Sequence, residues 1–230
     1  LQSNNDPRLR AIAIRYVGAT SGSGQLPAVG TTDPANQYGL PMGSTDGEAD
    51  LSGATLPGGG TRYAYSQLDR RRMAKPTSPL FIVTAAQNNL LLAEARLNDW
   101  INTGTVEEYF TNGIKAHMDQ MADFDPASAV SAGDRDTYVA SRVPLLAGNE
   151  LEQINYEYWI ASFLNGQEAW ANFRRSGYPD LDVNPFAGKT VDWITRLPYP
   201  PSEYVVNNEN VAAAVAGQGP DNLDTKVWWD

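Results

Sequence analysis

Apolar residues recur at helical spacing in two neighbouring segments near the middle of the chain. Within each segment they lie three or four positions apart, which places them on one face of a helix. Pro79 suits a first helical turn, Gly104 ends the first segment, and Thr105 followed by Glu108 has the spacing of a capping box. We therefore predict an antiparallel helical hairpin over residues 79–122. The apolar positions are Val83, Ala86, Leu90, Ala93, Leu97 and Ile101, then Val106, Phe110, Ile114, Met118 and Met121.

A third helical pattern predicts one long helix over residues 150–175. Its apolar face is rich in aromatic side chains, and such a face is more often part of a core than a platform for a ligand. Residues 178–230 are predicted to be irregular, because their prolines exclude a long helix, with one short helix near residues 208–215. The residues of the aromatic face are Tyr156, Trp159, Ile160, Phe163, Trp170 and Phe173.

Residues 18–69 show no periodicity and are predicted to form a long loop region. The stretch from Gly18 to Gly60 holds eleven of the chain's 20 glycines, with four prolines among them. A structureless segment of this length is uncommon in a compact domain, and it is usually either functional or disordered. Two interpretations stay open, a ligand-binding loop and a flexible insertion.

The predicted fold is mainly α, with a tetratricopeptide-like helical hairpin, a long helix and extensive irregular loops. These parts form a single region over residues 1–230, and no strand is assigned. The small residues Ala93, Ala95 and Gly113 would let the two hairpin helices approach closely, as tetratricopeptide-type hairpins do.

Charge and composition exclude several functions. The net charge of −10 and the pI near 4.5 repel phosphate backbones, so nucleic acid is not an expected partner. The absence of cysteine excludes disulfides, a thiolate nucleophile and Cys-rich metal sites. The single histidine, His117, lies beside the apolar face of the second hairpin helix, where a hydrogen-bonded structural role is favoured over catalysis.

Acidic residues leave two kinds of site open. Asp46, Glu48 and Asp50 have the alternating spacing with which a calcium-binding loop begins, and Asp180 with Asp182 is a similar pair in another loop. A solvated acidic turn is the simpler interpretation of both, so calcium is a weak candidate and no other cofactor is expected. Paired carboxylates for glycoside hydrolysis also stay open, because the sequence does not give their separation.

Short motifs follow one another along nearly the whole chain. They are Asp6-Pro7-Arg8, Pro79-Leu80-Phe81-Ile82-Val83-Thr84 before Leu90-Leu91-Leu92-Ala93-Glu94-Ala95, Tyr109-Phe110-x-x-Gly113-Ile114, Tyr158-Trp159-Ile160-Ala161 with Glu168-Ala169-Trp170-x-x-Phe173-Arg174-Arg175-x-Gly177-Tyr178-Pro179, Arg196-Leu197-Pro198-Tyr199-Pro200-x-x-Glu203 with Asn207 and Asn210, and Lys226-Val227-Trp228-Trp229-Asp230. In type and order these motifs resemble those of SusD/RagB proteins, which are outer-membrane nutrient-binding lipoproteins of Bacteroidota.

The resemblance implies the C-terminal part of a SusD-like lipoprotein at the cell surface. Such a protein binds a glycan or peptide nutrient without cleaving it and hands it to a TonB-dependent transporter of the SusC type. Its membrane contact is expected to be a lipid anchor in an N-terminal half that this sequence lacks. Two other functions stay open, a tetratricopeptide-like interaction module with no small ligand and a helical glycan-cleaving enzyme.

Ligand contacts in this family lie on variable loops, so physical chemistry must select the candidates in this chain. Sugars expose apolar C–H faces and many hydroxyl groups, which suit aromatic rings beside short amides and carboxylates. The loop region offers both kinds of side chain; alternatively, Tyr63 and Tyr65 only anchor the loop to the helices. Four motif residues of the C-terminal region look instead like a buried loop lock, in which Arg and Glu can satisfy each other and backbone carbonyls. They are Arg196, Tyr199, Glu203 and Asn207. The candidate ligand-binding residues are Asn36, Tyr38, Asp46, Arg62, Tyr63 and Tyr65.

Overall fold

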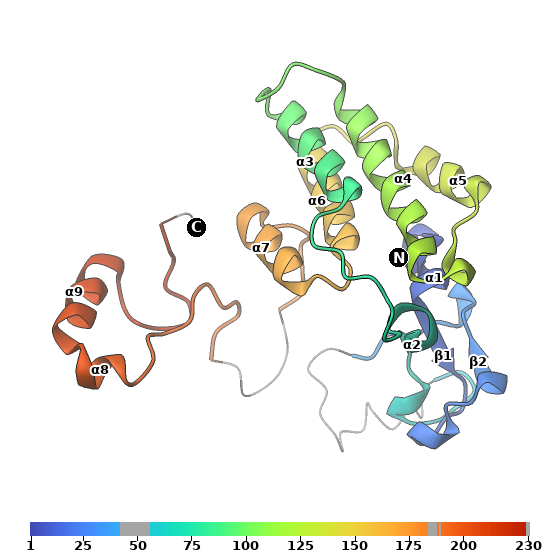
Figure 1. Ribbon diagram of the computed structural model, residues 1–230, viewed down its shortest axis with the longest axis horizontal. Coiled ribbons are helices and arrows are strands. Elements are labelled where there is room, and N and C mark those ends of the chain that lie inside the picture. Colours follow the sequence, from blue (N-terminus) through green and yellow to red (C-terminus); the bar gives the residue numbers. More distant parts are fainter. Residues whose placement is uncertain (42–55, 184–187, 189, 229–230) are drawn as a thin grey trace.

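The computed structural model is organised around a pair of antiparallel helices. These are α3 (Ala85–Leu97) and α4 (Val106–Phe124), which lie side by side in the helical body (Figure 1). The predicted helical hairpin is confirmed. The structure describes residues 1–41, 56–183, 188 and 190–228.

The first hairpin helix begins later than predicted. Residues 79–83 are not helical, because Thr84 caps α3: its hydroxyl accepts a hydrogen bond from the N–H of Gln87, whose side chain accepts one from the N–H of Thr84. Phe81 packs edge-on against Phe124, with ring centres 5.2 Å apart. The other apolar side chains before the cap are exposed, at 79%, 73% and 81% for Leu80, Ile82 and Val83.

The two hairpin helices meet at a glycine. A Cβ atom at Gly113 of α4 would lie 2.6 Å from Cγ of Leu90 and 3.2 Å from the carbonyl oxygen of Ala86, both on α3. No side chain fits there, so the predicted close approach at this small residue is confirmed. Phe110 and Ile114 on either side of it are fully buried.

The predicted long helix over residues 150–175 is wrong, because the chain forms two helices there. They are α6 (Glu150–Ala161) and α7 (Gly166–Ser176). Leu164 between them has a positive φ of 64°, and the Asn165 side chain accepts the N–H of Glu168 to begin α7. The aromatic spacing carries across this break and conceals it.

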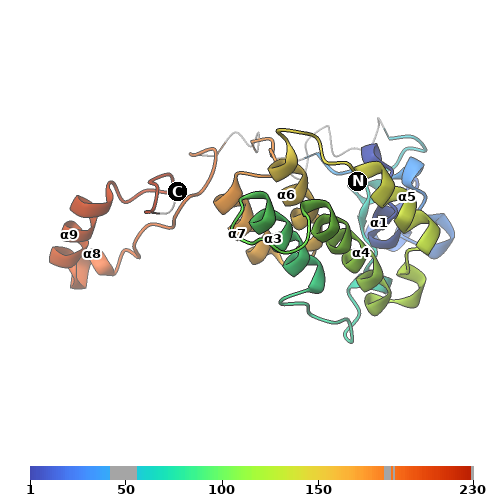
Figure 2. The same cartoon turned by 90° about the horizontal axis from the view of Figure 1, so that it is seen from above.

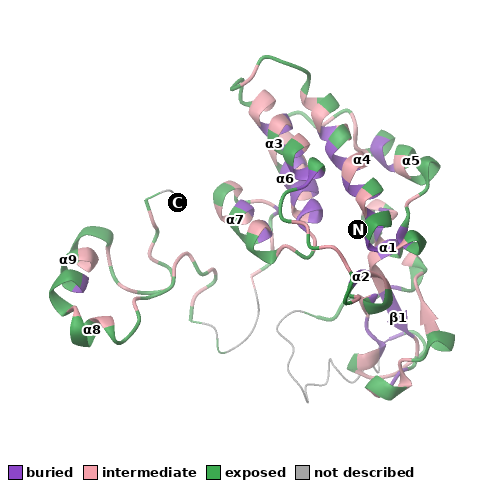
Figure 3. Ribbon diagram, viewed as in Figure 1, coloured by how far each residue is buried: buried purple, intermediate pink, exposed green. Residues whose placement is uncertain are grey.

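The main core lies where α3, α4 and α6 meet, with α5 (Ala132–Arg142) against the outer side of α4 (Figure 3). The predicted aromatic face lies outside this main core. Of its residues Ile160 is buried and Phe163 packs on a second cluster that contains Met121 and Phe124. Trp170 is 37% exposed and packs on Phe173 and Trp193, with ring centres 5.5 and 6.3 Å away.

A small sheet at the end of the body carries the loop region. Helix α1 (Arg8–Ile12) runs directly into β1 (Ala13–Tyr16), the central strand. On either side β2 (Gly30–Thr31) and β3 (Gln67–Leu68) pair antiparallel to it, in the order β2-β1-β3, and α2 (Arg70–Met73) follows (Figure 1). These strands were not predicted, since none exceeds four residues and no alternation can be recognised over such lengths.

The C-terminal segment contains α8 (Glu203–Val206) and α9 (Asn208–Gln218), which lie away from the helical body in both views (Figures 1 and 2). The second of these is the short helix predicted near residues 208–215. None of the described helices is both long and apolar enough to cross a membrane.

The contact at Gly113 gives a test of the hairpin. We expect Gly113→Ala to lower the free energy of unfolding by about 1–3 kcal/mol, because the added methyl group forces α3 and α4 apart. Gly133→Ala in α5 is the matched control, because its Cβ would meet no atom closer than 4.0 Å apart from the backbone of its own helix. Urea denaturation should show that variant unchanged or stabilised by up to about 1 kcal/mol. Equal effects of the two substitutions would contradict the close packing.

Candidate functional site

Arg15 on β1 holds the two ends of the loop region. Its side chain is 1% exposed, and its three donor nitrogens each bind a backbone carbonyl. Nε donates to Ala64 at 2.8 Å, Nη1 to Asn36 at 3.3 Å and Nη2 to Pro57 at 2.6 Å. One guanidinium group therefore ties the chain before residue 42 to the chain after residue 55.

Tyr38 lies against the same guanidinium group. The Arg15 guanidinium carbon is 4.7 Å from the centre of the Tyr38 ring, a cation–π contact, and the tyrosine remains 37% exposed. Its backbone is also fixed: the N–H donates to the Ser66 hydroxyl, and the carbonyl accepts the Ser66 N–H, both at 2.7 Å. The ring is thus held in one orientation at the surface.

Beside this clamp the loop region forms a hollow of about 500 Å³. Arg62 covers the ring of Tyr63 at 5.1 Å and donates a hydrogen bond to its hydroxyl at 3.3 Å. Tyr63 also packs on the small apolar cluster of β1, whereas Tyr65 is only 6% exposed. The lining residues are Gly22, Gln25, Leu40, Arg62, Tyr63, Tyr65, Ser66, Gln67 and Arg70.

The structure brings together three of the predicted ligand-binding residues, Arg62, Tyr63 and Tyr65, in this hollow. Tyr38 lies next to it through Ser66. The Asn36 side chain is used locally, since it donates to Asp33 at 3.1 Å. Asp46 lies outside the described residues.

Other contributors were missed by sequence reasoning. Gln25, Gln67 and Arg70 line the hollow, and Arg70 donates to Gln25 at 3.3 Å. Arg15 was missed too, although a charged residue between Ile14 and Tyr16 in an apolar run was the available signal. A buried charge of this kind must find partners inside the fold.

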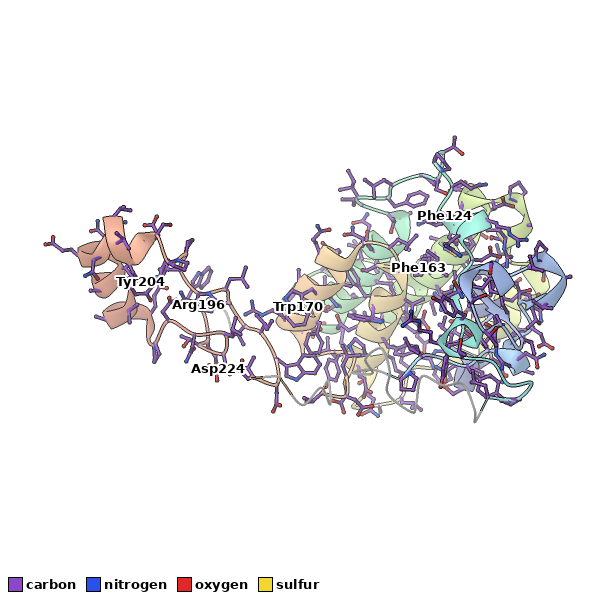
Figure 4. The ribbon with its side chains drawn as sticks, turned by 90° about the horizontal axis from the view of Figure 1, so that it is seen from below. Phe124, Phe163, Trp170, Arg196, Tyr204 and Asp224 are labelled. Atoms are coloured by element: carbon purple, nitrogen blue, oxygen red, sulfur yellow. The ribbon has the colours of Figure 1, made fainter. Side chains whose placement is uncertain are left out.

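A second cavity, of about 690 Å³, is largely apolar and lies between α6, α7, the N-terminal segment and the segment around residue 180, with Arg8 and His117 also on its wall. Trp159, Phe163 and Trp170 line it, and Figure 4 shows the labelled Phe163 and Trp170 on the helical body. Asp180 is at its edge and is exposed, as is Asp182.

Calcium stays a prediction. Among the residues that the structure describes, no three Asp, Glu or His side chains lie together as metal ligands. Asp180 and Asp182 are therefore a pair without a third ligand of this type. Asp46, Glu48 and Asp50 lie outside the described residues, so the other candidate site is not tested.

The Asp-Pro-Arg motif forms a buried ion cluster. Arg8, 1% exposed, binds Asp6 at 2.5 Å and Glu157 of α6 at 2.7 Å. Tyr138 of α5 donates to Glu157 at 2.7 Å. Burial disfavours the positive charge, but the carboxylates of Glu157 and Asp6 outweigh it and hold the pKa of Arg8 above its ordinary value.

His117 of α4 completes this cluster. The ring is 2% exposed, and Nδ1 lies 3.1 Å from Nη1 of Arg8. Burial, together with the positive charge of Arg8, lowers the pKa of His117 well below 6.5. The ring is therefore neutral and accepts a hydrogen bond from Arg8 through Nδ1. The prediction of a hydrogen-bonded structural histidine is confirmed.

A second polar network joins α3, α6 and α7. Arg175 forms a bidentate pair with Glu94, at 2.5 and 2.8 Å, and also donates to Asn172 at 2.8 Å. Asn172 in turn donates to Asn155 at 2.9 Å, and all three helices thereby share one set of bonds. These motif residues hold the fold and do not line the hollow.

The predicted C-terminal loop lock needs a correction. Arg196 pairs with Asp221 at 2.8 Å instead of with Glu203, and the N–H of Tyr199 also donates to Asp221. Glu203 accepts a hydrogen bond from Asn207 at 3.0 Å. All four residues of the predicted lock are half-buried and not buried. The acidic partner lies 25 residues further along the chain, where sequence spacing could not select it.

Two features therefore define the class of this protein: a body of packed helices, and a partly aromatic hollow built by a long loop at one end. Comparison with protein families agrees. The SusD-like family model, described as "starch-binding associating with outer membrane", matches residues 1–200, so the chain belongs to this family. Comparison with curated protein sequences gave no match.

Solved structures of similar proteins share this fold. A chitin-binding protein is 29% identical, with a TM-score of 0.75, over 100% of this chain and 48% of its own. A Bacteroidetes SusD-like protein, AC2a, is 24% identical, with a TM-score of 0.76, over 99% and 51%. A chitin-binding SusD homologue from Flavobacterium johnsoniae is 24% identical, with a TM-score of 0.60, over 99% and 47%. The chain spans about half the length of these structures.

The buried histidine predicts a pH dependence of stability. The folded state keeps His117 neutral, because burial opposes its protonation. Above pH 6.5 the histidine is neutral in the unfolded chain as well, so stability does not depend on its protonation. Below pH 6.5 the unfolded chain binds one more proton than the folded chain. This residue should lower the free energy of unfolding by about 1.4 kcal/mol for each pH unit below 6.5. Urea denaturation at several pH values between 7.5 and 5.5 gives the free energy of unfolding as a function of pH. It should fall less steeply with falling pH in His117→Asn, whose side-chain oxygen can still accept a hydrogen bond from Arg8. The same pH dependence in the variant and the wild type would contradict a buried neutral ring.

Proposed function

We propose that this chain is the glycan-binding part of a cell-surface protein that captures a nutrient glycan and passes it to a TonB-dependent transporter of the SusC type. The observation that carries the proposal is the match to a family described as starch-binding and associated with the outer membrane. The loop-built hollow supports the proposal, because its size and its lining side chains suit such a ligand.

The chemistry of the hollow suits a sugar. Its volume of about 500 Å³ is within the range of small-ligand pockets. The ring of Tyr63 lines it and that of Tyr38 lies at its margin, where each could stack on the C–H face of a pyranose. Gln25, Ser66 and Gln67 supply amide and hydroxyl groups for the sugar hydroxyls.

Binding without cleavage is favoured by the ionisable groups. No Asp or Glu is among the described residues that line the hollow, whereas glycoside hydrolysis generally uses two carboxyl groups. The single histidine of the chain, His117, is buried in the Arg8 cluster and does not line the hollow, so it cannot act as a general acid or base on a ligand bound in the hollow. We infer that the protein is not an enzyme.

The transporter partner has a direct test. Pull-down of the full-length protein from outer membranes should recover a TonB-dependent transporter of the SusC type. Recovery of the protein alone, from membranes that contain such a transporter, would contradict delivery and leave glycan capture as the function.

Two tyrosine substitutions test the binding site. We expect Tyr38→Ala and Tyr63→Ala each to weaken binding about two- to thirteenfold, because an aromatic contact contributes about 0.5–1.5 kcal/mol beyond the area that it buries. The measurement is calorimetric titration with maltoheptaose and with N-acetylchitohexaose, which represent starch and chitin. Tyr199→Ala is the matched control, because Arg196 covers that ring at 5.1 Å in the C-terminal segment, much as Arg62 covers Tyr63.

Three outcomes would contradict the proposal. Unchanged affinity of both loop variants for a glycan that the wild-type protein binds would place the ligand elsewhere. Release of reducing ends during prolonged incubation with the bound oligosaccharide would show an enzyme. Binding of a peptide mixture, with no response to either oligosaccharide, would replace the glycan by a peptide nutrient.

A further inference from the structure

We propose that Arg15 is the positioning residue of the ligand-binding hollow: it sets the separation of the two loop ends and covers one face of Tyr38, so that a sugar ring can stack only on the other. This inference rests on the proposed glycan-binding function. It assigns a role to a residue that lines neither cavity.

The environment of Arg15 differs from that of the other fully buried arginine. Arg8 is neutralised by two carboxylates, whereas within the described part of the chain Arg15 has no acidic partner. Burying an isolated charge is unfavourable, and carbonyl dipoles must replace the lost hydration. The three carbonyls provide this, and each must stay in place for the charge to remain buried.

The three carbonyls belong to three separate turns. Asn36 ends a short 3-10 helix at Pro34–Asn36, Pro57 follows residues 42–55, and Ala64 ends the 3-10 helix Arg62–Ala64 that carries two lining residues of the hollow. One guanidinium group thus fixes the distances between the three turns. It acts together with the Tyr38–Ser66 hydrogen bonds and the small cluster of Leu56, Ala64 and Tyr65, which join the same segments.

Tyr38 shows the consequence for specificity. Its ring has the Arg15 guanidinium at 4.7 Å on one side and is 37% exposed. A cation over one face occupies the side on which a second stacking partner would lie. The ligand therefore meets a single, fixed aromatic face, which lowers the entropy lost when a sugar stacks there.

Lysine cannot reproduce this arrangement. A guanidinium group is flat, donates in three directions and stacks on a ring, whereas an ammonium group is a single strongly hydrated point. Arg15→Lys therefore keeps the positive charge but lacks the flat, three-way donor geometry of the guanidinium group. This variant separates the positioning role from a simple need for positive charge.

The test compares Arg15→Lys and Arg15→Gln with Arg72→Lys. Arg72 is a matched control, because it also donates to two carbonyls, of Ala127 and Arg10, and to the Asp69 carboxylate, yet it does not line the hollow. Each variant is measured for affinity to the oligosaccharide that the wild-type chain binds, for thermal unfolding, and for amide hydrogen exchange in residues 30–40 and 56–66 and in α3 and α4.

We expect both Arg15 variants to bind at least tenfold more weakly, with faster exchange in the two loop segments and unchanged exchange in α3 and α4. Arg72→Lys should bind like the wild type even where its melting temperature falls by as much. Arg15→Gln carries no buried charge and keeps the test valid if Arg15→Lys folds poorly.

Wild-type affinity in both Arg15 variants, while Tyr38→Ala and Tyr63→Ala bind weakly, would overturn the positioning role and leave the proposed function intact. Loss of affinity in all three arginine variants, in proportion to their melting temperatures, would show a merely structural residue. Unchanged affinity in the Tyr38→Ala and Tyr63→Ala variants as well would contradict ligand binding in the hollow.

Discussion

The buried charge of Arg8 is the interaction on which the rest of the structure depends. Asp6 and Arg8 belong to the N-terminal segment, His117 to α4, Tyr138 to α5 and Glu157 to α6, so one guanidinium group joins four parts of the chain. Removing one partner of such a pair leaves a buried charge uncompensated, which is far less favourable than losing a surface ion pair.

This anchoring extends to the loop-built hollow through the backbone. Arg8 begins α1, and α1 continues without a loop into β1, which carries Arg15. The strand that clamps the loop region is thus held by the helices only seven residues before the clamp. The two ends of the glycine-rich segment are fixed to this anchored strand and not to each other alone, and the proposed binding role of the loop region requires such fixed ends.

The sequence allowed the helical body to be predicted, because regular spacing and capping chemistry are local. The pattern from Val106 to Met121 became α4, and Gly113 had the packing role its size suggested. Prediction failed where non-local contacts determine the structure. The helix breaks at Leu164 although the aromatic spacing continues across it, and Arg196 pairs with Asp221, which is distant in the sequence. Three of the predicted ligand-binding residues, Arg62, Tyr63 and Tyr65, line the hollow. Arg15 was not predicted, because its contacts are carbonyl groups of turns that are distant in the sequence.

The central claim is that ligand binds at the loop-built hollow and not in the larger apolar cavity beside α6 and α7. Amide hydrogen exchange of the wild-type chain, with and without a saturating oligosaccharide, tests this most directly. The account predicts that ligand slows exchange in residues 20–40 and 60–70 and leaves residues 156–170 unchanged. Slower exchange confined to residues 156–170 and 178–183, with the loop region unaffected, would contradict it.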